Sequence, residues 1–519
     1  MRILLVNPPT LYRWRLVTDE MSQISQTPYF STLLSNDGHF LNGRSTLPGE
    51  HLGLQSLAAS LRAKGHETVI VDACGEFHRS LSETADKVLE LGDFELIGFT
   101  GPTDVIGEIR WLIQFMRNTG FAGSIVLGND HGSLNAQMEL LAMPGLDYVI
   151  RGEGEESLPS LAHTLEHDCS LETVAGLSWR TPHGIKHNPP AKYALDLNTL
   201  PIPVRDRTAS VIASGMAASM FTKRGCLYRC DHCTTGQVAA NQKINLGPTW
   251  RTKTPAVAAN EFLELVDRFQ LAHLDIVDDL FVASDYRSHE WVFEFAELLL
   301  ERHNKATFMV DCRIDSLDKK LAVKLHQAGL RRVFIGVESG ADETLANLNK
   351  FYSKSATPAS QIDMIRECGI DPILGFIFMC PGDTPKTLSQ SVRFLREIQA
   401  DDYRLFSQKA RVYPASQLEM QLVKNTARKG SYPFYSFDYN DRQMQLISYY
   451  IRKASQSVSD LVEMHGPLPS AAEAKLFETF AIAINILLTF TDTANELETS
   501  AEEIAQCLVA DCEQILNAF

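Results

Sequence analysis

Long hydrophobic runs are absent from this sequence. The first apolar run, Ile3–Val6, ends at Asn7, and no other uninterrupted apolar stretch approaches the thickness of a bilayer. A membrane-spanning helix needs about 20 apolar residues, and the core of a signal peptide needs about 7 to 15. We therefore expect no membrane partner, and we expect a cytoplasmic protein.

Cysteine is also scarce, with 10 among 519 residues. Seven of the ten are scattered along the chain, which is not the pattern of a disulfide framework. The other three lie close together, between residues 226 and 233. A reducing compartment would keep these three available as thiolates.

Positive charge is in the minority. The chain has 48 Lys and Arg residues against 64 Asp and Glu, a formal net charge of -16, and no dense basic run. Nucleic-acid binding depends on clustered Lys and Arg side chains that neutralise phosphates. We therefore expect no nucleic acid among the partners.

The composition, 45% apolar and 22% charged, is typical of packed globular domains, and 519 residues exceed one ordinary domain. In the first 165 residues, short apolar runs alternate with helical patterns such as Leu54, Leu57 and Leu61, which ends at Gly65. This alternation predicts an α/β fold, a doubly wound parallel sheet over residues 1–167. The strand candidates are 2–6, 68–72, 96–100, 124–128 and 147–151.

Ligands of such sheets bind beyond the carboxyl ends of the strands, near the point where the strand order reverses. Glycine in these loops lets the backbone approach a ligand closely. The alternative is that the loops are ordinary turns that bind no ligand. The candidate cofactor-binding residues in these loops are Asn7, Pro8, Thr100, Gly101, Gly128, Asn129, His131, Gly152 and Glu153.

Two connections stand out by length or composition. Residues 10–50 form a connection much longer than the usual loop between a strand and a helix, so we expect it to cover a ligand or to dock on the next domain. Residues 168–215 are polar and end in the proline-rich Leu200–Pro203, which predicts an interdomain linker.

A second alternation of strands and helices runs over residues 216–424 and predicts a partial (β/α)6 barrel. Thr254, Thr357 and Thr384 each precede a proline, the pattern of a capped helix start. Residues 425–519 predict a small, mostly helical C-terminal region. The strand candidates of the barrel are 217–222, 273–277, 307–312, 332–337, 371–378 and 403–408.

Cys226, Cys230 and Cys233 follow the first barrel strand with C-x3-C-x2-C spacing. Three thiolates in one short loop can bind three corners of a 4Fe-4S cluster and leave the fourth iron open to a small chelating ligand. Zinc is the alternative, but it usually takes a fourth Cys or His ligand, and His232 lies awkwardly between two of the cysteines. The spacing therefore predicts an iron-sulfur site.

With this triad the sequence resembles the radical S-adenosylmethionine (SAM) superfamily. Segment 336–340 resembles the superfamily's SAM-binding fourth strand, which implies roles for Glu338 and Ser339, and segment 375–384 resembles the fifth-strand stretch near the adenine, which implies a contact from Phe378. The Gly-Gly-Glu that binds the SAM amino group in many members is missing, and Asp278 and Asp279 occupy its place. The resemblance implies reductive cleavage of SAM, with an external one-electron reductant such as flavodoxin or ferredoxin.

The first domain, placed before such a barrel, resembles that of the cobalamin-binding (B12-dependent) subclass. The similarity lies in segments 4–9, 51–54, 151–155 and 200–203. The Asp-x-His-x-x-Gly motif of several cobalamin enzymes is absent, so cobalamin could bind without a protein histidine on the cobalt. His131 is a candidate neighbour, although a lone loop histidine is more often solvated.

The subclass implies methylation of an unactivated carbon, or of a phosphinate phosphorus, of a small-molecule substrate through a 5'-deoxyadenosyl radical and methylcobalamin. The substrate would then lie between the two cofactors, at the domain junction. Cys380, Arg313 and Tyr413 are the catalytic candidates, and Arg313 is also a candidate for cofactor binding. Cys380 could instead pack as a small buried residue, and Arg313, like Arg411, could form a structural salt bridge.

Other functions remain open. The subclass also includes cyclases and ring-rearranging enzymes, and a radical SAM enzyme without cobalamin is a further alternative. A methylthiotransferase with a second cluster is disfavoured, because Cys74 and Cys169 are the only cysteines before Cys226. A non-catalytic cobalamin or Fe-S sensor is the alternative from another class.

Overall fold

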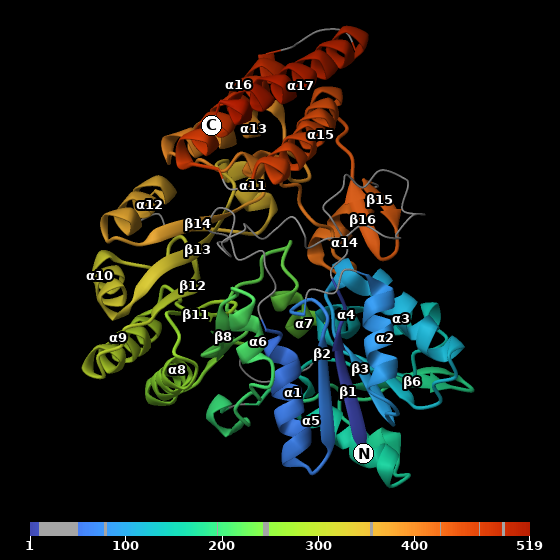
Figure 1. Cartoon of the computed structure of the whole chain (residues 1–519). Coiled ribbons are helices and arrows are strands. Elements are labelled where there is room, and N and C mark those ends of the chain that lie inside the picture. Colours follow the sequence, from blue (N-terminus) through green and yellow to red (C-terminus); the bar gives the residue numbers. More distant parts are fainter. Residues whose placement is uncertain are drawn as a thin grey trace.

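The computed structural model describes residues 1–9, 50–76, 80–194, 196–241, 249–352, 357–425, 427–466, 468–489 and 494–518. Figure 1 shows an N-terminal α/β domain in blue and cyan, an open barrel in green and yellow, and a helical region in orange and red at the far end of the barrel. The long connection predicted to cover a ligand falls largely on residues 10–49, outside the described residues. The limits 1–167, 168–215, 216–424 and 425–519 stay a prediction.

The N-terminal sheet has seven strands in the order β2-β1-β3-β4-β5-β6-β7. The first five are parallel, and the order reverses at β1, which pairs with β2 on one side and β3 on the other. Two hydrophobic cores cover the two faces, one contributed by α2, α3 and α4 and one by α1 and α5, so the sheet is doubly wound as expected (Figure 1). The strands are β1 (Arg2–Asn7), β2 (Glu67–Asp72), β3 (Leu96–Phe99), β4 (Ser124–Leu127) and β5 (Tyr148–Ile150); the helices are α1 (Leu52–Ala63), α2 (Leu81–Glu90), α3 (Ile106–Asn118), α4 (Asn129–Ala142) and α5 (Gly154–Glu166).

The predicted linker over 168–215 contributes more structure than expected. β6 (Leu177–Thr181) pairs antiparallel with β5, and β7 (Gly184–His187) pairs antiparallel with β6, so this hairpin extends the N-terminal sheet. Leu177, Ser178 and Trp179 are buried, which explains why the first strand of the hairpin joins the sheet although the segment is polar overall. The crossing to the barrel therefore begins after β7.

The barrel sheet has five parallel strands in the order β14-β13-β12-β11-β8. The sixth strand predicted over 403–408 is wrong, because residues Tyr403–Ser407 form a 3-10 helix capped by the side chain of Asp402. Among the described residues, the edge position beyond β14 holds a single parallel bridge, between Met379 and Lys409. The strands are β8 (Ala218–Met220), β11 (His273–Ile276), β12 (Thr307–Arg313), β13 (Leu330–Glu338) and β14 (Asp371–Phe376).

The barrel helices precede, separate and follow these strands along the chain, and a two-stranded ribbon, β9 (Lys223–Arg224) with β10 (Arg251–Thr252), extends the first strand. The predicted helix starts are confirmed: Thr254, Thr357 and Thr384 each accept a hydrogen bond from the backbone of the first turn. The helices are α6 (Thr208–Ala213), α7 (Thr235–Asn241), α8 (Pro255–Phe269), α9 (Tyr286–Glu301), α10 (Lys319–Ala328), α11 (Asp342–Asn347), α12 (Pro358–Glu367), α13 (Pro385–Glu397) and α14 (Gln417–Lys424).

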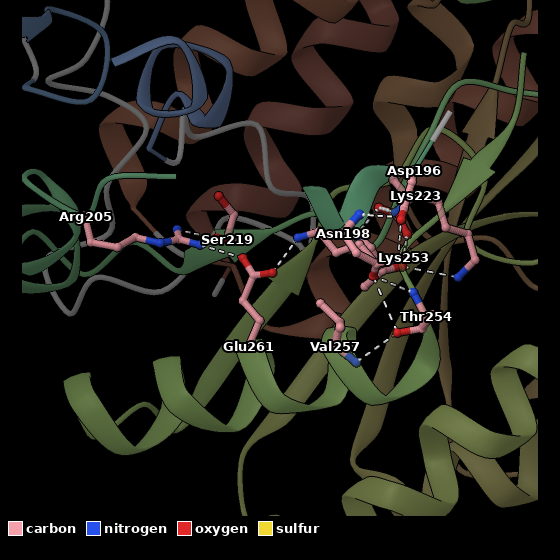
Figure 2. A network of polar contacts seen from close by, with 11 residues as sticks. Asp196, Asn198, Arg205, Ser219, Lys223, Lys253, Thr254, Val257 and Glu261 are labelled. Atoms are coloured by element: carbon pink, nitrogen blue, oxygen red, sulfur yellow. Dashed lines mark hydrogen bonds and ion pairs between the residues drawn. The ribbon is translucent and has the colours of Figure 1, made fainter. Parts of the chain in front are cut away.

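A buried polar network ties the crossing segment to the first barrel strand (Figure 2). Arg205 donates to the Ser219 carbonyl at 2.7 Å and to Glu50 at 2.6 Å, and it lies 3.6 Å from Glu261. Glu261 also pairs with Lys253, and both side chains are only 5% exposed. These charges are paired out of water, so the network joins α8 and β8 to the N-terminal domain in one arrangement.

The C-terminal region begins with a hairpin of β15 (Arg428–Ser431) and β16 (Phe434–Phe437). Three helices follow, and they share one hydrophobic core with the barrel. In the described part of the chain, no helix is both long and apolar enough to cross a membrane. The helices are α15 (Arg442–His465), α16 (Ser470–Thr489) and α17 (Ala494–Asn517).

Candidate active site

A cavity of about 620 Å³ lies where the N-terminal domain meets the barrel. One side is formed by the loops at the carboxyl ends of β3, β4 and β5, and the other by the segment that follows β8 and β11. We call it the junction cavity. Six of the predicted site residues line it together: Thr100, Asn129, Gly152, Glu153, Cys226 and Asp279.

The cysteine loop, residues 225–234, follows β9 and holds the three predicted ligands as free, partly buried thiols. Gly225 begins the loop at φ +78°, and a Cβ there would lie 1.8 Å from the Thr249 carbonyl oxygen, so only glycine fits. Burial raises the pKa of all three thiols, that of Cys226 to about 11. A bound iron cluster would replace these protons, because metal ligation requires the thiolate.

The donor set fits an iron-sulfur cluster better than zinc. Among the described residues, no three Cys, His, Asp or Glu side chains converge as ligands of a single ion. A cubane cluster binds its cysteines through separate iron atoms and does not need such convergence. The Nε2 atom of His232 lies 3.9 Å from the Glu338 carboxylate, so this nitrogen faces the carboxylate and not the three thiols.

The cysteine loop is held at both of its ends by the N-terminal domain. Before the loop, Arg224 pairs with Glu155 at 2.5 Å. After the last cysteine, the Thr234 hydroxyl donates to Asp130 at 2.9 Å. The same two strand-end loops were predicted to bind cobalamin, so they position the cysteine loop as well.

Glu153 lines the junction cavity, but its carboxylate is already paired. Arg251 donates to its two oxygens at 2.5 and 3.0 Å, and Arg224 lies 3.6 Å away. Because of these cations the pKa of Glu153 lies below its ordinary value although burial works the other way. Its observed contacts are therefore those of an ion-pair bridge between the domains.

The two aspartates after β11 have different environments. Asp278 is 1% exposed and accepts hydrogen bonds from the backbone of Thr222 and Lys223 at 2.7 and 2.9 Å. It therefore braces the strand that leads to the cysteines and does not line the junction cavity. Asp279 does line the cavity, accepts from Thr235 at 3.1 Å, and has its pKa raised by burial.

Glu338 ends β13 in a left-handed conformation, at φ +64°. Lys350 donates to its carboxylate at 2.5 Å, and a Cβ on Gly336 would lie 2.8 Å from that amine, so the glycine makes room for the pair. Next to this pair, the buried Nδ1 of His232 has no hydrogen-bond partner among the described residues. An unpaired buried ring nitrogen beside a carboxylate and an amine fits a polar cofactor such as SAM.

Several predicted residues instead pack in the interior. Ser339 is 3% exposed and bonds to Ser391 at 3.2 Å, and Phe378 is 1% exposed with its ring against Phe406. Cys380 is fully buried, and its thiol faces the Ile377 carbonyl oxygen at 3.6 Å. None of these side chains lines the junction cavity. In the structure, Cys380 therefore packs as a small buried residue, which was the alternative to a catalytic role.

Arg313 and Tyr413 lie beside the cysteine loop, outside the lining of the cavity. The Arg313 guanidinium lies 3.8 Å from the ring centre of Tyr228, a loop residue, and donates to Asp315 at 3.1 Å. Tyr413 accepts from Arg411 at 3.3 Å, and Arg411 also pairs with Asp104 of the N-terminal domain. Both arginines form salt bridges, the structural alternative, and Arg313 also contacts the loop that holds the cysteines.

The N-terminal side of the junction fits a large cofactor. An apolar slot between the strands and α1 adjoins the junction cavity and shares Leu57, Asn129 and Gly152 with it. A Cβ on Gly128 or Gly152 would meet no atom within 4 Å, so these glycines leave space open at the slot. The slot measures about 70 Å³, so a bulky ligand such as cobalamin would occupy it only in part and would extend into the junction cavity.

His131 does not face this space. Its Nδ1 lies 2.9 Å from the Thr103 hydroxyl and its Nε2 3.0 Å from Glu139, and its side chain is fully buried. Tyr432 of the C-terminal hairpin donates to the same Glu139 at 2.5 Å. His131 thus belongs to a network that docks the hairpin, and it contributes no ligand to the junction cavity.

Three further predicted residues shape the loops from behind. The Asn7 side chain donates to Asp72 at 2.7 Å, Pro8 is buried beside it, and a Cβ on Gly101 would lie 2.5 Å from Val105. None of the three lines the junction cavity.

His51 and Tyr193 are among the residues that line the junction cavity but were not predicted as site residues. His51 caps α1 through its Nδ1, and burial lowers its pKa. The Arg251 guanidinium carbon lies over the Tyr193 ring, 4.6 Å from the ring centre. The position of His51 directly before a predicted helix could have marked it as a site candidate. Tyr193 lies in the predicted linker, and no sequence pattern there indicates a role in the site.

Comparison with known families agrees with this geometry. Residues 220–395 match the model of the Radical SAM superfamily, and residues 38–162 match the model of the B12 binding domain. The barrel with its cysteine loop thus defines the class, a radical SAM enzyme. With the B12-binding domain before it, the protein belongs to the cobalamin-binding radical SAM family, whose cofactors are a 4Fe-4S cluster, SAM and cobalamin. The match argues against the alternative without cobalamin.

Individual relatives are distant. The chain is 23% identical over 383 residues to the "uncharacterized methyltransferase PH0819" of Pyrococcus horikoshii, covering 73% of this chain and 79% of the relative. It is 26% identical over 348 residues to an anaerobic magnesium-protoporphyrin IX monomethyl ester cyclase of Synechocystis, covering 65% of this chain and 66% of the relative. The solved structure of the cobalamin-dependent radical enzyme OxsB, with aqua-cobalamin and SAM bound, has a TM-score of 0.73 at 17% identity and covers 100% of this chain and 81% of that one. This likeness shows the fold.

Proposed function

We propose that this enzyme is a cobalamin-dependent methyltransferase that acts on an unactivated carbon, or a phosphinate phosphorus, of a small-molecule substrate. One observation carries the proposal: a single cavity is bounded by the glycine loops of the B12-binding domain and by the cysteine loop. A substrate in that cavity would touch both cofactor regions. The similarity to a protein described as a methyltransferase supports the same reaction.

When bound, the cluster with SAM supplies a radical that removes a hydrogen atom, and cobalamin supplies the methyl group. The role of the protein is to hold the cofactors and the substrate and to orient them. Cys226, Cys230 and Cys233 would hold the cluster. Asp279 and Glu338, with the His232 ring, would contact SAM, and the Gly128 and Gly152 loops would contact cobalamin. The ion pairs of Glu153 and Glu155 would keep the two halves together and water out.

A ring-forming reaction is the second candidate, since the chain is also similar to a protein described as a cyclase. It would use the same cavity and radical, but it transfers no methyl group. In either reaction an external reductant, such as flavodoxin or ferredoxin, must deliver one electron at a time. A cytoplasmic location, which supplies such donors and keeps the thiols reduced, is part of the proposal.

The experiment is an anaerobic reconstitution followed by a labelling assay. The protein is loaded with iron, sulfide and hydroxocobalamin, freed of excess ligand, and analysed for metals. We expect about four irons and one cobalamin per chain. The holoenzyme is then incubated with reductant, SAM carrying a deuterated methyl group, and candidate small molecules, with Cys226→Ala as the control variant.

The products separate the alternatives. A methyltransferase forms S-adenosylhomocysteine, 5'-deoxyadenosine and a product that carries the deuterated methyl group. A cyclase forms 5'-deoxyadenosine and an unlabelled product. A loaded protein that forms no 5'-deoxyadenosine under any of these conditions would contradict an enzymatic role and favour a sensor.

A further inference from the structure

His51 directly precedes α1 and lines the junction cavity. Two residues of the same helix, Leu54 and Leu57, line the apolar slot, and Leu57 borders both spaces. His51 itself does not line the slot, so it lies where the wall of the slot meets the junction cavity. The roles proposed above for cofactor-binding residues do not include it.

The backbone of His51 is fixed by the ends of two strands. Its N–H donates to the Asp72 carboxylate at 3.0 Å, and the same carboxylate accepts from the Asn7 side chain at 2.7 Å. Gly53 makes room for the imidazole, because a Cβ there would lie 3.0 Å from the His51 Cε1 atom. The ends of β1 and β2 and the start of α1 therefore define the place of this ring.

The cap of α1 determines which ring nitrogen carries the proton. The Leu54 backbone N–H points to the His51 Nδ1 at 3.2 Å and is shared with the His51 carbonyl oxygen at 3.1 Å. A backbone N–H can only donate, so Nδ1 accepts and carries no proton. Burial lowers the pKa of His51, although the Asp72 carboxylate acts the other way, so the ring is neutral at neutral pH. The proton of the neutral ring therefore lies on Nε2.

The Nε2 atom is the free end of the ring. It takes part in no hydrogen bond within the described part of the chain, and it is not one of the unpartnered side-chain atoms that are sealed from solvent. It therefore has open surface, and the space that His51 lines is the junction cavity. An N–H group in this position is available to an acceptor on a bound molecule.

We propose that His51 binds cobalamin through its Nε2–H group, which donates to a carboxamide oxygen on the rim of the corrin, and that His51 is not a ligand of the cobalt. Carboxamide side chains surround the corrin, and their oxygens accept hydrogen bonds from N–H groups. Ligation through Nε2 would move the ring proton to Nδ1 and break the cap of α1. The proposal rests on cobalamin binding and not on methyl transfer, so the two are tested separately.

The test is an absorbance titration of the full chain, with its cluster reconstituted, with hydroxocobalamin in the absence of SAM and substrate. His51→Ser keeps a capping oxygen but removes the ring donor, so cobalamin affinity is expected to fall about tenfold with an unchanged urea midpoint. His51→Gln keeps an N–H donor at a similar reach but caps poorly, so affinity is expected to stay within about threefold while the urea midpoint falls. An unchanged affinity in His51→Ser, or an equal loss in both variants, would overturn the donor role.

Ser80→Ala is the matched control for the loss of a helix cap. The Ser80 hydroxyl accepts from the Glu83 N–H at 3.1 Å at the start of α2, and Ser80 does not line the junction cavity. This variant is expected to lower the urea midpoint and to leave cobalamin affinity unchanged. A loss of affinity here would attribute the effect to capping and overturn the assignment. A wild-type protein that bound no cobalamin would overturn the proposed function as well, whereas an unchanged affinity in His51→Ser overturns this proposal alone.

Two further measurements locate the acceptor. Cobinamide has the corrin and its carboxamides but no nucleotide tail, and His51→Ser is expected to weaken its binding by the same factor as that of hydroxocobalamin. A loss confined to hydroxocobalamin would place the acceptor on the tail and overturn the choice of the corrin. Electron paramagnetic resonance of the Co(II) form is expected to give the same spectrum for the wild type and His51→Ser. A nitrogen hyperfine splitting that disappears in the variant would show that Nε2 ligates the cobalt and would overturn the donor role.

Discussion

The two sides of the cysteine loop are held in different ways. On the side of the junction cavity, the contacts are made by charged or hydroxyl side chains of two domains, as in Arg224 with Glu155 and Thr234 with Asp130. On the side of α11 and α14, the loop is fastened within the barrel by backbone hydrogen bonds, from Asp231 to Leu348 at 3.0 Å and from Leu418 to Asp231 at 3.1 Å. Two neutral side-chain amides add to them: Gln421 donates to the Asp231 carboxylate at 2.6 Å, and Asn349 donates to the Arg229 carbonyl at 3.0 Å.

The difference has a functional meaning. Backbone hydrogen bonds within one domain persist as long as the barrel is folded. Ion pairs across a domain boundary depend on how the domains are docked, because both partners must be brought together. We therefore expect the junction side to respond to cobalamin, and the barrel side to keep the loop's shape whether or not cobalamin is present.

The largest effect is expected from a substitution that removes the iron-sulfur cluster, which the cysteine loop binds between these two sides. Cys230→Ala deletes one of three cluster ligands, so iron after reconstitution is expected to fall from about four per chain to near zero. Cys169→Ala, at an exposed cysteine far along the chain from the loop, is the control and is expected to keep full iron. Iron analysis and the cluster absorbance check both, and retention of a stable cluster by Cys230→Ala would contradict the ligand assignment.

The next effect concerns the cobalamin side of the comparison. Gly128→Leu would place a side chain into the open slot, and Gly128 has an extended backbone that leucine can adopt, so cobalamin affinity is expected to fall about tenfold to a hundredfold. His131→Gln is the contrast, because His131 faces Thr103 and Glu139 rather than the cavity. Absorbance titration with hydroxocobalamin checks this pair, and equal losses in both variants would refute the distinction.

The sequence predicts best what is contiguous along the chain. The cysteine triad, the strand-end glycines and the capped helix starts each lie within a few residues, and the structure has them where they were expected. The sixth barrel strand failed for a local reason: Leu405 and Phe406 are apolar, but the Asp402 side chain caps a 3-10 helix there. The hairpin of β6 and β7 was missed because its polar residues outnumber the buried ones.

The residues of the site were harder to predict than the fold, because their roles depend on partners far away in sequence. Glu153 was expected to contact a cofactor, yet Arg251 takes up its carboxylate. His131 was a candidate neighbour of cobalt, yet Glu139 and the Tyr432 hydroxyl surround it. Neither periodicity nor spacing in the sequence predicts such side-chain pairs, because they form only when separate elements pack together.

A smaller effect tests the ionic side of the loop. Glu153→Gln removes the charge that Arg251 and Arg224 share, and it is expected to lower the free energy of unfolding by about 2 kcal/mol, because the pair is largely buried. Glu172→Gln breaks an exposed pair with Lys186 and is expected to cost at most about 0.5 kcal/mol. Urea unfolding of the apoprotein measures both, and equal costs would show that burial does not distinguish them.

The smallest effect tests the barrel side. Gln421→Ala removes one hydrogen bond to the Asp231 carboxylate and is expected to cost about 1 kcal/mol in the free energy of unfolding, with cobalamin affinity unchanged. Gln114→Ala, which breaks an exposed amide pair with Asn118, is the matched control and is expected to cost at most about 0.5 kcal/mol. Combined with Glu153→Gln, the effect of Gln421→Ala should add, since the two side chains share no partner. A coupling well beyond about 0.5 kcal/mol would mean that the two sides of the loop act as one unit, and would end the distinction between them.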